Sequence, residues 1–341
     1  MKKFLLLALF IAFSQGKVVI DSDGKGVEVP ENVQHATALI GGFVQMAAML
    51  GNESKVITGS PKLPPLMQKI FPKIRSNGNP SGMMGSSVEA ILASKTQVVF
   101  GPVGMRLDES AAAQLVRAGI VVVNLQVPGT TEQLKRCVSV IADIFGGESP
   151  QKAREFNAYF DENVNFVRSR TAKIEQKKRV LVLNFGANAY STIDSRDMGA
   201  EYIAIAGGLN LSSQLGSSGD FKVSKLINEE QIIGFDPDAV LTNSREGVEK
   251  ILQNPAFKGL KAVKTRQIFV VPSGVYLWSV RSAEGALYPL WLGKTLYPEL
   301  FADLNMPQKV REFYAKFYGY KLSDAQIQGI LQPERWIYRQ K

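Results

Sequence analysis

The chain has 341 residues, with a single cysteine and a single histidine. One cysteine excludes an intramolecular disulfide, and so few imidazole and thiolate ligands nearly exclude a protein-only zinc, copper or nickel site. The formal net charge of +9 comes from scattered lysines and arginines. That distribution argues against nucleic-acid binding and favours a small anionic ligand or an anionic surface.

The first sixteen residues have the pattern of a secretory signal peptide. Lys2 and Lys3 precede ten apolar residues, 4–13, and small residues follow at Ser14 and Gly16. A membrane-spanning helix needs about 20 apolar residues, so this run is too short to be one. Cys137 is far from the cleavage region, which leaves no site for a lipid anchor. We therefore expect cleavage near Gly16 and Lys17, and a mature protein free in the periplasm.

Short β-branched runs alternate with helical patterns after the signal peptide, which is typical of parallel sheets flanked by helices. In residues 17–147, the predicted N-terminal lobe, the expected strands are 36–40, 55–58, 97–100 and 120–125. Helices are expected at 43–50, 64–70, 87–94 and 108–118. A second set of strands at 179–185, 239–242 and 268–272 predicts a C-terminal lobe spanning 179–341.

Residues 148–178 are predicted to form one long helix between the lobes. Pro150 suits a first helical turn, and apolar residues follow at helical spacing. About 28 residues at 1.5 Å each would span about 40 Å. The fold class expected is therefore α/β, with two Rossmann-like lobes joined by a single long α-helix and a ligand cleft between the lobes. Such a rigid linker predicts that the lobes close only slightly.

Two segments 141 positions apart align without a gap: SVEAILASKTQVVF, which contains Glu89, and NEEQIIGFDPDAVL, which contains Glu230. In each, a glutamate opens a short helix and two large aliphatic residues follow. This indicates one structural unit used once per lobe. Taken alone, both glutamates are also consistent with ordinary acidic residues at a helix N-terminus.

Together with AGGLN at 206–210 and LKAVKTRQIFVVPSGVYLW at 260–278, these segments resemble the iron-siderophore and cobalamin family of periplasmic binding proteins. This is the helical-backbone class, which includes enterochelin and nickel-chelate receptors. The resemblance implies a two-lobed receptor that delivers its ligand to an ABC permease dimer in the inner membrane. It also implies that Glu89 and Glu230, rather than Glu229, dock into arginine pockets of the permease.

Ligands of open α/β sheets bind beyond the carboxyl ends of the strands. The corresponding loops here contain four arginines, whose forks bind carboxylates and oxyanions, and aromatic residues that could cover a chelator. The candidate ligand-binding residues are Arg106, Tyr190, Arg196, Arg245, Tyr276, Trp278 and Arg281. Trp278 is expected at the cleft rim, and each loop arginine could instead be a surface ion-pair partner.

Metal contacts are less defined. Tyr190 or Tyr276 could complete the shell of a chelated ferric ion, whereas His35 precedes the first strand and is expected to be structural. Methionines at 83, 84 and 105 are expected to line the cleft as flexible apolar residues, although soft thioethers could also favour a copper or haem-like ligand.

The expected function is capture of a metal chelate, a ferric siderophore or a nickel chelate, by a monomer without a permanent cofactor. A molybdate-like oxyanion or a corrinoid remains an alternative ligand on the same fold. An enzyme is the weakest alternative, because GGLN and FGANA lack the spacing of a nucleotide-binding loop and no histidine is placed to act as a base.

Overall fold

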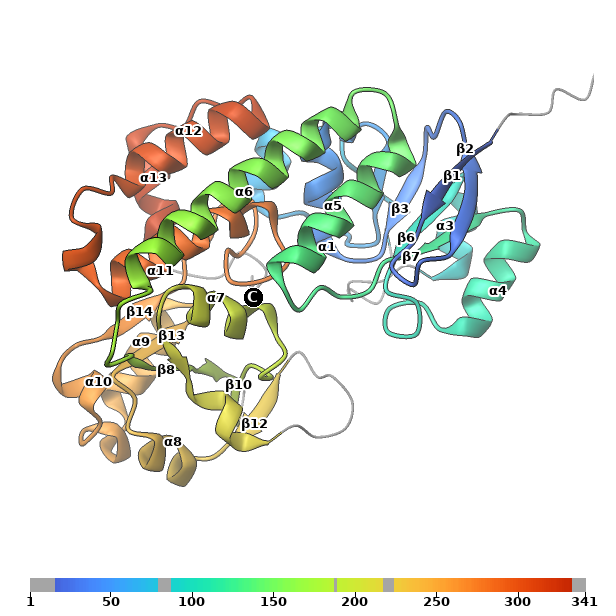
Figure 1. The fold of residues 1–341 in the computed structure, drawn as a ribbon. Coiled ribbons are helices and arrows are strands. Elements are labelled where there is room, and N and C mark those ends of the chain that lie inside the picture. Colours follow the sequence, from blue (N-terminus) through green and yellow to red (C-terminus); the bar gives the residue numbers. More distant parts are fainter. Residues whose placement is uncertain (1–15, 79–86, 187–188, 217–223, 333–341) are drawn as a thin grey trace, which may run out of the picture.

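A computed structural model describes residues 16–78, 87–186, 189–216 and 224–332 (Figure 1). The predicted signal peptide, apart from Gly16, and the methionines at 83 and 84 lie outside these ranges. Within them, none of the helices combines the length and apolar character that a membrane crossing requires.

Fourteen strands and thirteen α-helices occur within the described residues. The strands are β1 (Gly16–Ile20), β2 (Gly26–Pro30), β3 (Ala36–Ala38), β4 (Val56–Thr58), β5 (Arg75–Ser76), β6 (Val98–Gly101), β7 (Val121–Asn124), β8 (Arg179–Val182), β9 (Asn184–Phe185), β10 (Tyr190–Thr192), β11 (Leu209–Asn210), β12 (Lys225–Ile227), β13 (Ala239–Thr242) and β14 (Ile268–Val270). The helices are α1 (Gly41–Ala47), α2 (Pro65–Ile70), α3 (Val88–Ala93), α4 (Glu109–Arg117), α5 (Thr131–Phe145), α6 (Ser149–Thr171), α7 (Met198–Ile205), α8 (Glu229–Phe235), α9 (Arg245–Gln253), α10 (Lys261–Lys264), α11 (Tyr288–Leu296), α12 (Met306–Tyr318) and α13 (Asp324–Leu331).

Each lobe contains a parallel sheet, as predicted. The N-terminal sheet has the order β5-β4-β3-β6-β7, and the C-terminal sheet has the order β11-β8-β13-β14. The central strands β6 and β13 are buried along their whole length because helices cover both faces of the sheets. The carboxyl end of each sheet is therefore the place where loops can form a site.

Two smaller sheets were not predicted. β1 and β2 form an antiparallel hairpin, and β12, β10 and β9 form a short antiparallel sheet in the C-terminal lobe. Their strands have two to five residues, and each small sheet keeps some residues exposed, so they lack the length and full burial of the central parallel strands.

The long linking helix is α6, which runs beside both lobes (Figure 1). It ends at Thr171, seven residues earlier than predicted. There the chain packs closely on Gly207, where a Cβ would lie 2.9 Å from both Ile174 Cδ1 and Thr171 Cβ. Ile174 thus contacts the turn between α7 and β11 instead of extending the helix. The 23 residues of α6 span about 34 Å.

The C-terminal helices α12 and α13 do not stay with the C-terminal lobe, contrary to the predicted unit 179–341. They lie on one side of α6, and the sheets of the C-terminal lobe lie on the other (Figure 1). The Tyr318 ring packs edge-on against Phe71 of the N-terminal lobe at 5.3 Å, and the Phe317 ring contacts Phe156 of α6 at 5.6 Å. One hydrophobic core consequently runs through the N-terminal lobe, α6 and these helices.

Candidate functional site

Arg281 lies at the junction of the two lobes. Its Nε donates to the Pro128 carbonyl oxygen at 3.0 Å, and its Nη2 is 2.5 Å from Asp197 Oδ2. Asp197 also caps α7, since its Oδ1 accepts from the Gly199 N–H at 2.8 Å. The Arg281 carbonyl oxygen lies so close to Gly42 that a Cβ there would be 1.8 Å away. The guanidinium, which was predicted as a ligand contact, therefore joins the two lobes.

Tyr276 and Trp278 are buried, which corrects the expectation that Trp278 lies at the cleft rim. Their exposed fractions are 6% and 0%. We expected the two side chains to alternate along an extended segment. Instead the segment turns back on itself: Ser273 bridges Leu277, and the Trp278 N–H donates to the Pro272 carbonyl at 3.1 Å. A turn removes the alternation of faces and places both rings inside.

Glu284 forms the centre of this buried junction and was not predicted from the sequence. Its carboxylate accepts the backbone N–H groups of Val275 at 3.1 Å and Tyr276 at 2.6 Å. Gln45 of α1 donates at 3.1 Å, and the Tyr314 hydroxyl of α12 also donates. Burial raises the pKa of Glu284 to about 7, although these hydrogen bonds oppose the shift. Its only sequence signal was a lone carboxylate in a largely apolar stretch.

Tyr190 is held on the outer side of the C-terminal lobe. Its hydroxyl donates to Glu229 Oε1 at 2.8 Å and accepts from Asn254 Nδ2 at 3.0 Å, and its ring packs on Phe185 and Phe257. Burial, together with the neighbouring Glu229 carboxylate, raises the pKa of Tyr190. The hydroxyl, predicted as a possible metal ligand, is thus hydrogen-bonded to two neighbouring side chains. A surface pocket of about 430 Å³ adjoins it.

Arg196 borders a groove between the lobes, which we call the interlobe groove, with a volume of about 720 Å³. Val127 and Gly129 line it from the N-terminal lobe. Asp194 Oδ1 lies 3.1 Å from Arg196 Nε. Burial alone would raise the pKa of Asp194, but hydrogen bonds from Arg196 and the charge of Lys225 outweigh it and lower the pKa. Asp194 is thus charged and pairs with Arg196 at the edge of the interlobe groove.

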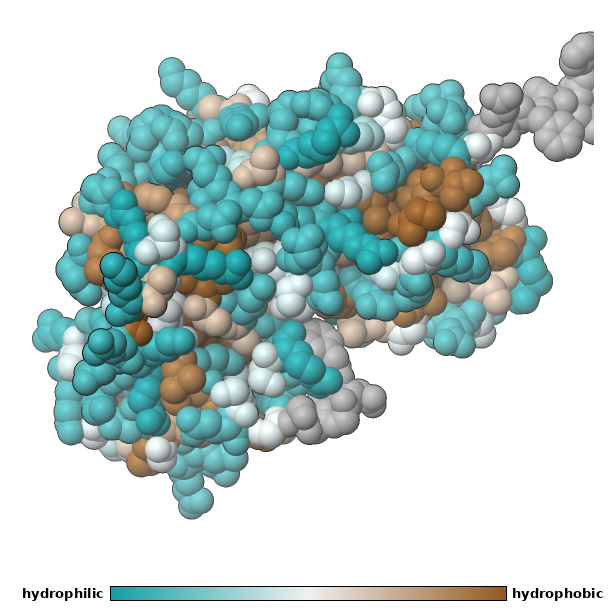
Figure 2. Space-filling view, in the orientation of Figure 1, coloured by the Kyte–Doolittle hydropathy of each residue, from teal (hydrophilic) through white to brown (hydrophobic). Residues whose placement is uncertain are grey.

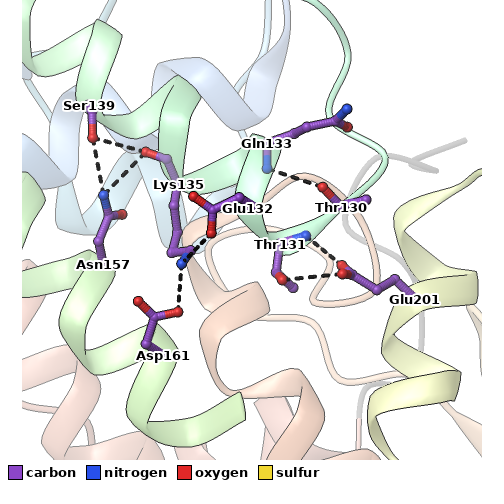
Figure 3. Close-up of polar contacts among 9 residues, drawn as sticks. All are labelled: Thr130, Thr131, Glu132, Gln133, Lys135, Ser139, Asn157, Asp161 and Glu201. Carbon is purple, nitrogen blue, oxygen red and sulfur yellow. Dashed lines mark hydrogen bonds and ion pairs between the residues drawn. The ribbon is translucent and has the colours of Figure 1, made fainter. Parts of the chain in front are cut away.

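The interlobe groove is crossed by a direct contact between the lobes. Glu201 of α7 accepts the Thr131 N–H, in the first turn of α5, at 2.5 Å, and its other oxygen lies 3.4 Å from the Thr131 hydroxyl (Figure 3). A carboxylate is favoured at this position because the helix N-terminus carries unpaired N–H groups and a positive dipole. The contact fixes α7 against α5.

Arg106 and Arg245 differ from the other two arginines. Arg106 follows β6 and is half-buried, and its Nε is buried with no hydrogen-bond partner among the described residues. Arg245 is the exposed first residue of α9, which is separated from β13 by two residues, the second of them its N-cap Ser244. Each follows the carboxyl end of a central strand, one in each lobe.

Glu89 and Glu230 occupy equivalent places, as the repeat predicted. Ser87 and Asn228 cap the two helices, and both glutamates are exposed in the first turn. Hydrogen bonds from its own backbone and from Ser87 lower the pKa of Glu89, so its carboxylate is charged. Glu229, in contrast, is hydrogen-bonded to Tyr190 and Asn254 and is not available for an outside partner.

His35 and Met105 both lie in the N-terminal lobe, at opposite ends of its parallel sheet. His35 Nδ1 lies 3.3 Å from the Lys95 carbonyl oxygen, at the amino end of β3, where its position is structural. Met105 is 45% exposed in the loop after β6.

Comparisons with known proteins identify relatives along almost the whole chain. The family described as "Periplasmic binding protein" matches residues 77–275. The molybdate-binding protein MolA of Haemophilus influenzae is 22% identical over 355 aligned positions, which cover 94% of this chain and 97% of MolA.

Solved structures show the same fold. MolA bound to molybdate superposes with a TM-score of 0.75 at 19% identity, covering 90% of this chain and 99% of MolA. A solute-binding protein of an ABC transporter from Sulfurospirillum deleyianum gives 0.74 at 19% identity, covering 93% and 99%. CeuE of Helicobacter pylori, in a complex with nickel and histidine, gives 0.72 at 18% identity, again covering 93% and 99%.

Proposed function

Because the chain belongs to the periplasmic binding protein family, we propose that it captures a small solute in the periplasm and presents it to an ABC permease in the inner membrane. The two parallel sheets with their loops at the carboxyl ends, joined by α6, support a receptor of this kind. Export would use the predicted signal peptide at residues 1–16. The MolA structure comes from an ABC transporter system, which supports the same partner here.

We propose a molybdate-like oxyanion as the solute. The observation that carries this choice is the contrast between the predicted aromatic and basic residues. Tyr276 and Trp278 are buried, so they cannot cover a broad chelator, whereas Arg106 and Arg245 follow the strand ends of opposite lobes. Guanidinium groups bind oxyanions through paired hydrogen bonds, and a small anion needs donors more than apolar surface. The similarity to MolA over 94% of this chain supports the same choice.

An anionic metal chelate is the second candidate. The similarity to CeuE in complex with nickel and histidine favours it, and the same two arginines could bind carboxylates of such a chelate. Iron or nickel would then be cargo, held by its chelator rather than by protein side chains.

Titration calorimetry of the purified mature protein tests the proposal with four probes: molybdate, tungstate, nickel–histidine and ferric citrate. We expect molybdate and tungstate to bind. Replacing Arg106 or Arg245 with alanine should weaken binding about 10- to 100-fold, which corresponds to about 1.5–3 kcal/mol for a charged hydrogen bond.

Arg154→Ala is the matched control, because Arg154 lies exposed on α6 and contacts Gln151. Its affinity should equal that of the wild type. If only the metal chelates bind, the proposed solute is an anionic metal chelate and not an oxyanion. If both arginine variants bind like the wild type, the arginine-based site is wrong.

We further propose that Glu89 and Glu230 dock the receptor onto the permease. Their equivalent positions provide one exposed carboxylate per lobe for a two-fold partner, and exposed charges of this kind govern encounter and register.

A further inference from the structure

Each lobe exposes a large aliphatic side chain one helical turn after its docking glutamate. Leu92 follows Glu89 by three residues on α3, and Ile233 follows Glu230 by three residues on α8, so each pair shares a helix face. Both aliphatic side chains are 44% exposed. Both stand five residues after their N-caps, and the residues just before them, Ile91 and Ile232, are fully buried.

A second pair repeats the arrangement on the following helices. Val116 of α4 and Leu252 of α9 both stand eight residues after their N-caps, Asp108 and Ser244. Their exposed fractions are 57% and 48%, while the preceding residues of both helices are core residues. In the N-terminal lobe α3 contacts α4, and in the C-terminal lobe the residues just after α9 contact α8.

Scattered exposed aliphatic residues need no explanation, but a matched set does. Nine large hydrophobic side chains are exposed among the described residues, and four of them form these two pairs. The core alone cannot account for the match, because the core positions are the residues next to them. The helices α4 and α8 lie at the outer ends of the two lobes, away from α6 (Figure 1).

We infer that Leu92 and Ile233, supported by Val116 and Leu252, form the apolar half of the docking surface. The inference rests on the proposed docking of Glu89 and Glu230. Its partner is the two-fold ABC permease, whose two equivalent subunits would each offer an apolar recess beside a basic side chain. A carboxylate next to an aliphatic residue on each lobe is complementary to such a pair of recesses.

The two halves of this surface act on different steps. Exposed glutamates steer the encounter with a basic partner and lose their effect as salt is added. Buried aliphatic contacts are insensitive to salt and mainly slow dissociation. The receptor would therefore keep part of its affinity for the permease at high salt through the aliphatic residues.

The test measures the ATPase activity of the permease complex of the native host, reconstituted in proteoliposomes, as receptor concentration is varied. The variants are Leu92→Ser with Ile233→Ser, and Glu89→Lys with Glu230→Lys. We expect the serine pair to raise the half-maximal receptor concentration about tenfold at low and at high salt alike. The lysine pair should abolish stimulation at low salt. Ligand affinity and unfolding midpoint should stay at wild-type values in both.

Val18→Ser is the control, since Val18 is 67% exposed in the β1–β2 hairpin, outside the repeat, where Figure 2 shows a hydrophobic patch. It should behave like the wild type. If the lysine pair fails to stimulate the ATPase but the serine pair stimulates it normally, the glutamates dock as proposed and the inference of an apolar contact is wrong. If both pairs stimulate normally, the proposed docking through the glutamates is wrong as well. A serine pair that changes only the sedimentation of the free receptor would assign the surface to a second copy of the chain and overturn the inference.

Discussion

Glu284 lies wholly inside the molecule and joins three elements through one carboxyl group. Burial raises its pKa to about 7, against a usual value of 4.5, so the folded state holds a proton that the unfolded chain releases. The stabilising effect of the protonated form is complete below pH 4.5 and is lost as pH rises through about 7.

Glu284→Gln tests this pH dependence, because glutamine copies the neutral carboxyl and does not titrate. Between pH 4.5 and pH 8 the wild type should lose about 3 kcal/mol of unfolding free energy relative to the variant. Urea unfolding of both proteins at matched pH values measures the difference. A difference that stays constant over this range would mean that Glu284 does not titrate there.

At the level of single residues, the sequence predicted the positions set by local pattern. Glu89 and Glu230 were identified because cap, glutamate and aliphatic residues repeat over a few positions. Trp278 was misplaced because its burial depends on the turn at 272–278, which is held by contacts with Glu284 and with Tyr314 of α12. Such contacts join residues far apart in the chain, and periodicity carries no information about them.

Among the elements, α7 is fixed to the junction by the ion pair between Arg281 and its cap Asp197. Both side chains are at least 90% buried. Arg281→Met should lower the unfolding free energy by about 3–5 kcal/mol, because it leaves the Asp197 carboxylate buried without its partner.

Arg311→Met is the comparison variant, and urea unfolding measures the loss of free energy in both. Arg311 pairs with Asp324 at 2.6 Å, but the two side chains are 38% and 91% exposed. Its loss should cost less than about 1 kcal/mol. Equal losses in the two variants would show that the buried pair contributes no more than a surface pair.

The elements differ in how well the sequence predicted them. Parallel strands such as β6 and β13 are continuous apolar runs and were located to within a residue or two. The end of α6 was not, because the chain there packs on Gly207, which is distant in the sequence, and a helical pattern cannot reveal such a contact. The small antiparallel sheets were not, because their strands are short and partly exposed, and β9 lies within the single strand predicted at 179–185.

For the whole molecule, the junction favours a fixed angle between the lobes. Glu201 binds the N-terminus of α5, Arg281 joins Pro128 to Asp197, and Glu284 binds Gln45 of α1. At Gly129 the lobes approach so closely that a Cβ would lie 2.5 Å from the Arg196 carbonyl oxygen. A core that continues through α6 adds to these contacts, and packed cores have few alternative arrangements.

Spin labels on the two lobes measure how far they move. In a Cys137→Ser background, which removes the single buried thiol, Gln114→Cys on α4 and Glu249→Cys on α9 place labels at exposed positions of opposite lobes. Adding molybdate should shift the mean distance between labels by less than about 2 Å, the range of pre-organised binding. Glu201→Ala should broaden the distance distribution of the free protein, because it removes the carboxylate that binds the first turn of α5. A larger ligand-induced shift in the wild type, or an unchanged distribution in Glu201→Ala, would show that the junction contacts do not hold the lobes and that closure takes place by a hinge elsewhere in the chain.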